Sequence, residues 1–203
     1  KMSPSTELVR LVHPILIAIP QWSPMQTVKT ILAALAATAM TIPVAACAQS
    51  SLSFDGYLEL VAAKAKAAHE AGLKPIVCVG EQLDDRESGR TEEVVGGQIR
   101  GSLTGLTTAQ MEGTVVAYEP VWAIGTGKTA TSAQAQEVHA FIRNLLGDIF
   151  DEDTARRSRI QYGGSVKPDN ARELMSQTDV DGALVGGASL DVRNFSEIIL
   201  NSI

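Results

Sequence analysis

The sequence has few cysteines, few aromatic residues and no excess of positive charge. Its two cysteines, Cys47 and Cys78, are too few for the disulfide framework of a small secreted domain. Aromatic residues make up 4% of the chain, and 23 acidic against 17 basic residues give a net charge of −6. We therefore expect neither a nucleic-acid partner nor an anionic membrane partner. A small soluble ligand and a reducing, cytoplasmic location are the expected setting.

The chain also lacks a long uninterrupted hydrophobic run. The most apolar stretch, residues 31–47, is broken by Thr38, Thr41 and Pro43, so we interpret it as core and not as a membrane span. A hydrophobic content of 45% over 203 residues is enough for one well-buried core. Because no internal repeat or low-complexity linker divides the chain, residues 1–203 are expected to form a single domain.

Short apolar runs alternate with longer stretches of helical periodicity, which is typical of an α/β fold with parallel strands and helical crossovers. Helices are expected over Leu60–Ala71 and Ala133–Leu146, and Gly72 and Gly147 are expected to end them. The expected strands are Ile15–Ile19, Thr41–Ala46, Ile76–Val79, Val115–Tyr118, Ile160–Tyr162 and Ala183–Val185.

The segment AYEPVWAIGTGKTAT, residues 117–131, places Glu119 at the carboxyl end of an expected strand. Parallel α/β folds hold their catalytic groups at such strand ends. A carboxylate beside a glycine-containing loop that can close over it is suited to remove a proton from a carbon next to a carbonyl. A single Glu-Pro pair would more often lie on the surface, but the whole segment favours a catalytic glutamate.

Two pairs of glycines follow the last two expected strands, in QYGGSV (161–166) and ALVGGASL (183–190). One such pair alone is more often a tight turn. Together, Gly164, Ser165, Gly186 and Gly187 could hold a phosphate dianion through backbone amides and helix dipoles. Glycine-rich loops after the last two strands are typical of the phosphate site in barrel enzymes.

These segments, with AGLKPIVCVGE (71–81), resemble the triosephosphate isomerase family in order and spacing, continuously from about residue 59 to residue 203. The resemblance implies a TIM (β/α)8 barrel in which the first strand and an α/β unit around the third and fourth strands have no visible counterpart. It implies interconversion of dihydroxyacetone phosphate and glyceraldehyde 3-phosphate, a step of glycolysis and gluconeogenesis, with no cofactor and no metal.

The resemblance also assigns roles to single residues. Glu119 would shuttle a proton between two substrate carbons through an enediolate, and Gly125, Ser165, Gly186 and Gly187 would bind the phosphate. Cys78 would be a packed thiol and not a nucleophile. The lid and its supporting residues would be Pro120, Val121, Trp122, Ala123, Ile124, Thr126, Gly127, Lys128, Tyr162, Gly163, Gly164 and Glu81. Tyr162 would hydrogen-bond the closed lid, although a half-buried tyrosine at a strand end is an equally good interpretation.

Two parts of the family pattern lack a clear counterpart. Lys1 resembles the substrate-binding lysine, but the strand that would support it is absent from the sequence. The His-Ser-Glu-Arg-Arg segment, whose histidine polarises the substrate carbonyl, is also absent. His13, His69 and His139 are expected on a helix surface or in a loop, so none of them replaces that histidine.

Two alignments account for the missing histidine. In one, a segment of the family pattern is absent after AACAQSS; in the other, which has no gap, Cys47 takes the place of the histidine and Gln49 that of the neighbouring glutamate. A thiol is a weak hydrogen-bond donor and would polarise a carbonyl poorly. The second alignment therefore predicts an impaired isomerase.

The same gap affects assembly. In the family, the loop after the third strand inserts into a partner subunit, and residues 49–55 resemble a short remnant of it. We expect a homodimer if the loop is present and a monomer or weak dimer otherwise. The alternative function is a non-catalytic homologue that only binds phosphate ligands or serves as a scaffold. Another phosphate-handling barrel enzyme is disfavoured by the AYEPVWAIGTGK segment.

Overall fold

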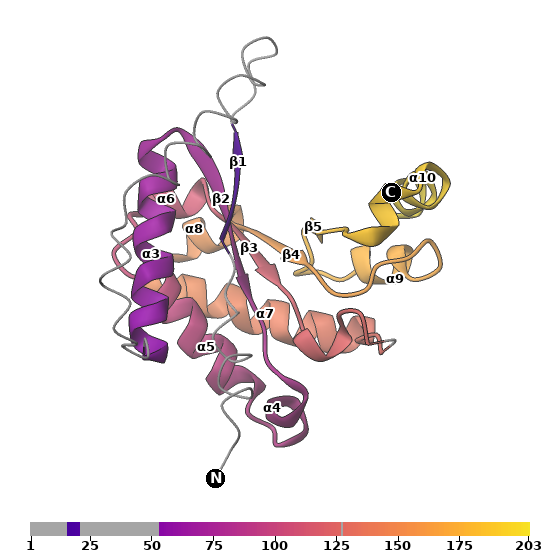
Figure 1. Ribbon diagram of the computed structural model, residues 1–203, viewed down its shortest axis with the longest axis horizontal. Helices are drawn as coiled ribbons and strands as arrows, with labels where there is room; N and C mark the ends of the chain where they lie inside the picture. Colours follow the sequence, from indigo (N-terminus) through magenta and orange to yellow (C-terminus); the bar gives the residue numbers. More distant parts are fainter. Residues whose placement is uncertain (1–15, 21–52, 127) are drawn as a thin grey trace, which may run out of the picture.

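The structure, a computed structural model, describes residues 16–20, 53–126 and 128–203 (Figure 1). The strands of this part form one sheet in the order β1-β2-β3-β4-β5. Their bounds are β1 Leu16–Pro20, β2 Leu73–Val79, β3 Val115–Tyr118, β4 Arg159–Tyr162 and β5 Gly182–Ala183. From β2 to β5 each strand pairs in parallel with the next one, whereas β1 is antiparallel to β2.

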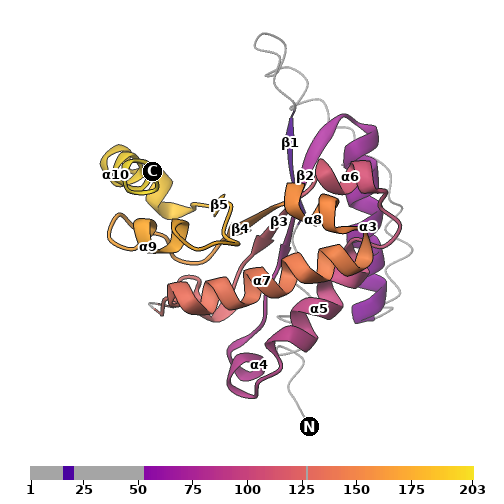
Figure 2. The same ribbon diagram turned by 180° about the vertical axis from the view of Figure 1, so that it is seen from behind.

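Helices cover one face of this sheet. The three longest are α3 (Phe54–Glu70), α5 (Thr91–Ser102) and α7 (Ser132–Ile149), which lie against the sheet in Figures 1 and 2. The shorter elements are α4 (Leu83–Glu87), α6 (Thr108–Glu112), η2 (Val121–Ala123), α8 (Glu152–Arg157), α9 (Ala171–Met175), η3 (Gly187–Leu190) and α10 (Val192–Asn201).

The two faces of the sheet bury different sets of side chains. Val77 and Val79 belong to the large core that the helices form with the sheet. Ile76, Cys78 and Ala117 form a separate small cluster. Because side chains alternate along a strand, the second set lies on the face away from the helices. Both faces of β2 are buried, which explains its nearly continuous apolar sequence.

The strand predictions are confirmed for β2, β3 and β4, although β2 begins three residues before the predicted Ile76. The prediction that the first described strand is parallel is wrong, because Leu16 to Pro20 pair with Val77 to Leu73 in the antiparallel sense. The last strand was predicted over Ala183–Val185, but its ladder covers only Gly182 and Ala183. The strand predicted over Thr41–Ala46 lies outside the described residues.

The two helix predictions are confirmed, although α3 begins at Phe54 and not at the predicted Leu60, and the predicted end of α7 is wrong. Helix α3 ends before Gly72, whose φ of 72° is the left-handed conformation expected of a terminating glycine. Helix α7 continues through Gly147 to Ile149. Ile149 and Phe150 pack against the core, so burial of this last turn continues the helix past the glycine.

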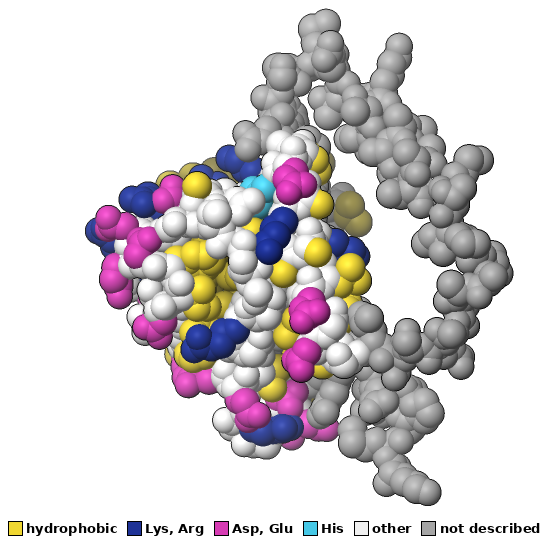
Figure 3. All heavy atoms as spheres, turned by 90° about the vertical axis from the view of Figure 1, so that its left-hand side faces the viewer, with side chains coloured by type: hydrophobic (Ala, Val, Ile, Leu, Met, Phe, Trp, Pro, Cys, Tyr) yellow, Lys and Arg dark blue, Asp and Glu magenta, His cyan; other side chains and the backbone are white. Residues whose placement is uncertain are grey.

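The charges on the face that α3 covers are mixed, with acidic and basic side chains interspersed (Figure 3). None of the helices in the described part of the chain is both long and apolar enough to cross a membrane.

Candidate active site

The catalytic candidate Glu119 lies at the carboxyl end of β3, between the ends of β2 and β4. Its backbone N–H donates to the Val79 carbonyl at 2.7 Å, and the Gly163 N–H donates to the Tyr118 carbonyl at 2.8 Å. These bonds extend the parallel ladder one step beyond the strands. The sheet therefore fixes the backbone of Glu119 from both sides.

The side chain of Glu119 lies over Gly163. A Cβ atom at Gly163 would stand 2.6 Å from Glu119 Cγ and 3.2 Å from its Oε1, so only glycine leaves room for the carboxylate there. By alternation along β3, Glu119 points to the same face as Ala117, away from the helices. The carboxylate thus points to the face opposite the one that helices α3, α5 and α7 cover.

Cys78 supports the carboxylate from β2. The thiol is fully buried, and burial first and the Glu119 carboxylate second raise its pKa. A thiol in these surroundings stays protonated, so it can donate a hydrogen bond but is a poor nucleophile. This agrees with the prediction that Cys78 is a packed residue and not a reactive one.

Glu81 connects the end of β2 to the start of the lid. Its buried carboxylate accepts hydrogen bonds from the Tyr118 hydroxyl at 3.1 Å and from the Trp122 indole N–H at 2.9 Å. Burial first and Glu81 second raise the pKa of Tyr118, so its hydroxyl remains a donor. The first turn of the lid is therefore held by a side chain from the neighbouring strand.

The segment predicted to be the lid, residues 120–128, begins with Pro120 and the short helix η2. Gly125 has a φ of 68°, which a residue with a side chain would adopt only with strain. The Thr126 hydroxyl donates to the Trp122 carbonyl at 2.6 Å and accepts from the Lys128 N–H at 3.2 Å. After the lid, a capping box at Thr131 starts α7.

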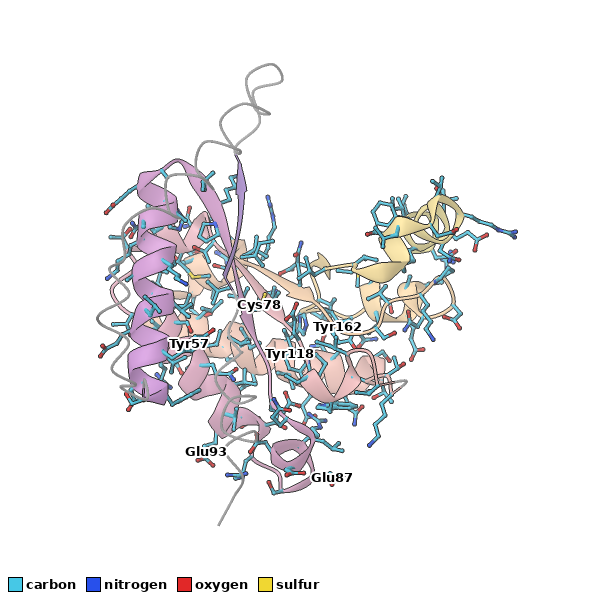
Figure 4. All side chains as sticks on the ribbon, viewed as in Figure 1. Tyr57, Cys78, Glu87, Glu93, Tyr118 and Tyr162 are labelled. Carbon is cyan, nitrogen blue, oxygen red and sulfur yellow. The ribbon has the colours of Figure 1, made fainter. Side chains whose placement is uncertain are left out.

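Tyr162 is fully buried, so the interpretation as a half-buried strand-end tyrosine is wrong. Its ring lies 6.4 Å from that of Tyr118, and both are labelled in Figure 4. Burial raises the pKa of Tyr162 to about 12, partly opposed by the backbone of Ala130. A Cβ atom at Gly164 would stand 2.2 Å from the Tyr162 hydroxyl oxygen. Glycine at 164 is therefore required by the tyrosine.

The phosphate candidates follow the adjacent strands β4 and β5. Ser165 comes three residues after β4, and its carbonyl accepts from the Asn170 side chain at 3.0 Å. Gly186 and Gly187 are exposed, and a Cβ atom at either would meet no atom within 4 Å. Both glycines thus have free space beside their Cα atoms, although the Gly186 carbonyl accepts from the Ser189 hydroxyl at 2.7 Å. No group of three or more His, Cys, Asp or Glu side chains in the described ranges is arranged to hold a metal ion.

Comparison with known proteins bears on this arrangement. The sequence model of the triosephosphate isomerase family matches residues 53–202. Curated triosephosphate isomerases are similar over the same part: that of Fusobacterium nucleatum is 57% identical over 70% of this chain and 56% of its own length. That of Moorella thermoacetica is 64% identical over 67% of this chain and 54% of its own length.

This chain belongs to the triosephosphate isomerase family. The residues that carry the resemblance, from the Glu119 segment to the two glycine pairs, lie within the matched range. The chain spans about half the length of the curated relatives that it matches. The family membership also confirms the predicted fold class of the matched part.

Several residues named in the predictions from sequence, among them the rejected histidine His13, lie outside the described part of the chain. They are Lys1, His13, Cys47, Gln49 and Gly127. The described residues bring Glu119 together with Cys78 and Gly163 on one face of the sheet. On the other face, Glu81 bonds to Trp122 and to Tyr118, whose ring lies near that of Tyr162. Ser165, Gly186 and Gly187 follow the paired strands β4 and β5.

The prediction that His139 lies on a helix surface is wrong. It is fully buried on the inner side of α7, 5.8 Å from the ring of Tyr118, with Nδ1 3.2 Å from the Asp179 carbonyl. Burial, the largest effect, lowers its pKa to about 4. His69 is half-buried and bonds to Thr114 through Nε2 at 2.9 Å. Neither of these two histidines lies at a strand end in the way Glu119 does.

Sequence reasoning missed two polar groups that order this region. Gln98 bonds to the backbone of Gly80, and Arg143 pairs with Asp179 and Asp181, both at 2.7 Å. Each of these side chains bonds to residues that are distant from it in sequence, so no local pattern reveals the contact.

Proposed function

We propose that the protein is a triosephosphate isomerase that interconverts dihydroxyacetone phosphate and glyceraldehyde 3-phosphate, with Glu119 as the catalytic base. The observation that carries the proposal is the position of Glu119, at a strand end between Cys78 and Gly163 and directly before the lid. The identities to curated triosephosphate isomerases over this part support it.

In this proposal the carboxylate removes a proton from the carbon beside the substrate carbonyl and returns it to the neighbouring carbon. The lid, Pro120 to Lys128, closes over the site and keeps water from the enediolate. The Glu81 bonds to Trp122 and Tyr118 hold the first turn of the lid in place. Glu81 is thus a positioning residue and not one that touches substrate.

The phosphate of the substrate is proposed to bind at the ends of β4 and β5. Backbone amides of Gly186 and Gly187, next to Ser165, and the Gly125 amide from the lid are the proposed donors. Support comes from the open space at both glycines and from the positive φ of Gly125. Amides at the start of helical turns favour an anion without needing a lysine.

The second candidate function is a phosphate-binding homologue with little turnover. One observation motivates it: in the described ranges, His139 is buried against Tyr118 on the helix side of the sheet and His69 bonds to Thr114, so neither faces the side onto which Glu119 points. Lys1 and Cys47 remain proposals for electrostatic help with the carbonyl. A single domain, a cytoplasmic location and a homodimer built by the loop after the third strand are likewise proposed from the family.

The test is an isomerase assay on the complete protein with dihydroxyacetone phosphate, comparing wild type with Glu119→Gln. Glu92→Gln, on the exposed side of α5, is the matched control. We expect Glu119→Gln to lower kcat by at least about 100-fold, the usual contribution of a general base, and Glu92→Gln to leave it unchanged.

Binding of dihydroxyacetone phosphate, measured by calorimetry, separates the two candidates. Saturable binding without turnover in the wild type would support the phosphate-binding homologue. Turnover that is equal in the wild type and in Glu119→Gln would contradict the role of Glu119.

A further inference from the structure

Gln98 makes an unusual contact at the end of β2. Its side chain, 4% exposed on the inner side of α5, bonds twice to one residue: Gly80 N–H donates to Oε1 at 2.8 Å, and Nε2 donates to the Gly80 carbonyl at 3.0 Å. A backbone normally finds such a pair of bonds in a neighbouring strand. The side chain of Gln98 therefore takes the place of a strand partner where β2 has ended.

Gly80 in turn packs against the backbone of the catalytic candidate. A Cβ atom at Gly80 would stand 1.8 Å from the Glu119 carbonyl oxygen and 2.6 Å from its carbon. No side chain fits in that space, so the two backbones are in direct contact. Any shift of Gly80 would therefore move Glu119 or open a gap beside it.

Backbone bonds on both sides of Gly80 lead to the base and the lid. Glu119 N–H donates to the Val79 carbonyl at 2.7 Å, and Val121 N–H donates to the Glu81 carbonyl at 3.1 Å. Residues 79–81 thus form a support: their backbone holds the backbone of Glu119 and of the first lid residues. Gln98 is the side chain that holds the middle of this support.

We propose that Gln98 is a positioning residue for the reaction: its two bonds to Gly80 set where the backbone of Glu119 and the start of the lid lie. The proposal rests on the proposed role of Glu119 as base. Without the amide, the Gly80 N–H and carbonyl lose their buried partners, and the strand end is free to shift. Since a displacement of about 1 Å at a catalytic group can cost on the order of 100-fold in rate, a small shift is enough to matter.

The chain also offers a matched control. Gln136 on α7 is half-buried and also makes two bonds to one residue, Nε2 to the Asp179 carboxylate oxygen Oδ2 at 2.6 Å and Asp179 N–H to Oε1 at 3.0 Å. That pair holds the loop before β5 and does not touch the backbone at Glu119. Gln98→Met and Gln136→Met therefore each remove two side-chain amide hydrogen bonds to a single residue. Methionine keeps the length and helix preference of glutamine.

The experiment measures kcat and KM for dihydroxyacetone phosphate in the complete protein, with amide hydrogen exchange by NMR on the same samples. We expect Gln98→Met to lower kcat by about 10- to 100-fold with less than about a threefold change in KM. The amides of Gly80, Glu119 and Val121 should exchange faster in Gln98→Met than in the wild type. Gln136→Met should change neither kcat nor these three amides.

The outcomes separate this proposal from the proposed function. If Gln98→Met left kcat and the three amides unchanged, or if Gln136→Met changed them equally, the positioning role of Gln98 would be overturned. If the wild type showed no turnover beyond Glu119→Gln, the proposed function would fail. In that case the exchange of the Gly80, Glu119 and Val121 amides alone would still decide whether Gln98 positions this backbone.

Discussion

The end of β3, where Glu119 lies, and the end of β5, which precedes Gly186 and Gly187, differ in how deeply the neighbouring residues are buried. At the strand ends around Glu119, the residues Cys78, Glu81 and Tyr118 are at most 1% exposed, and the Tyr118 hydroxyl donates a hydrogen bond to Glu81. Beyond β5, Leu190 and Val192 are 89% and 83% exposed. One side of the candidate site is thus enclosed, and the other is open.

The difference shows that the two halves of the proposed chemistry depend on different kinds of support. A base must be held within a fraction of an ångström, and here buried side chains and close backbone contacts can do that. A phosphate dianion bound through backbone amides needs an open approach and a suitable backbone path. The exposed end after β5 is consistent with such an approach.

The largest effect on the free energy of unfolding is expected from a substitution at Gly80, on the enclosed side. Gly80→Ala would place a methyl group 1.8 Å from the Glu119 carbonyl oxygen, so one of the two backbones must move. We expect at least about 3 kcal/mol of destabilisation, as for severe overpacking. Urea unfolding followed by circular dichroism measures it. A loss under about 1 kcal/mol would show that the enclosed side is more adaptable than its contacts indicate.

A smaller effect is expected at His139, which packs against the enclosed side. Since its pKa is about 4 in the folded protein against 6.5 as a free side chain, the unfolded chain binds the proton more readily. The stabilisation from the neutral imidazole is complete above about pH 6.5 and is lost as pH falls towards 4. The expected loss is on the order of 2 to 3 kcal/mol.

The measurement is the unfolding free energy from pH 7 down to pH 4 for wild type and His139→Gln. His69→Gln, at a half-buried histidine, is the control. The stability of the wild type should fall more steeply than that of His139→Gln across this window. Parallel curves would mean that His139 titrates alike in the folded and unfolded chains.

The smallest effect is expected on the open side. Gly187→Ala adds a methyl group that meets no atom within 4 Å, so the unfolding free energy should change by less than about 0.5 kcal/mol. The same urea titration measures it. A loss comparable with that of Gly80→Ala would show that this end of the molecule is packed as tightly as the other.

The sequence predicted the strands in which the buried apolar residues are the same residues that pair with neighbouring strands. Strands β2 and β3 are buried on both faces, so their apolar runs coincide with their ladders. At the last strand the same rule predicted too long a strand: the Leu184 N–H still donates to the Tyr162 carbonyl at 2.9 Å, but the apolar Val185 lies past this last bond. Apolar character reports burial and not strand pairing, and the two separate where a chain leaves a sheet.

The candidate site was predicted where local motifs carry it and missed where distant residues do. Glu119 and the glycine pairs stand in short segments with a recognisable order. Gln98 lies 18 residues after Gly80, and its role depends on how α5 packs against the end of β2. The burial of His139 likewise depends on which side of α7 faces the sheet.

The most direct test of Glu119 as the base is the exchange of a substrate proton with solvent. Dihydroxyacetone phosphate is incubated with the protein in D2O, and NMR follows deuterium entering the carbon that carries its hydroxyl group. The account predicts that wild type catalyses this entry at least about 100-fold faster than Glu119→Gln, even if overall isomerisation is slow. Equal rates in the two proteins would contradict it.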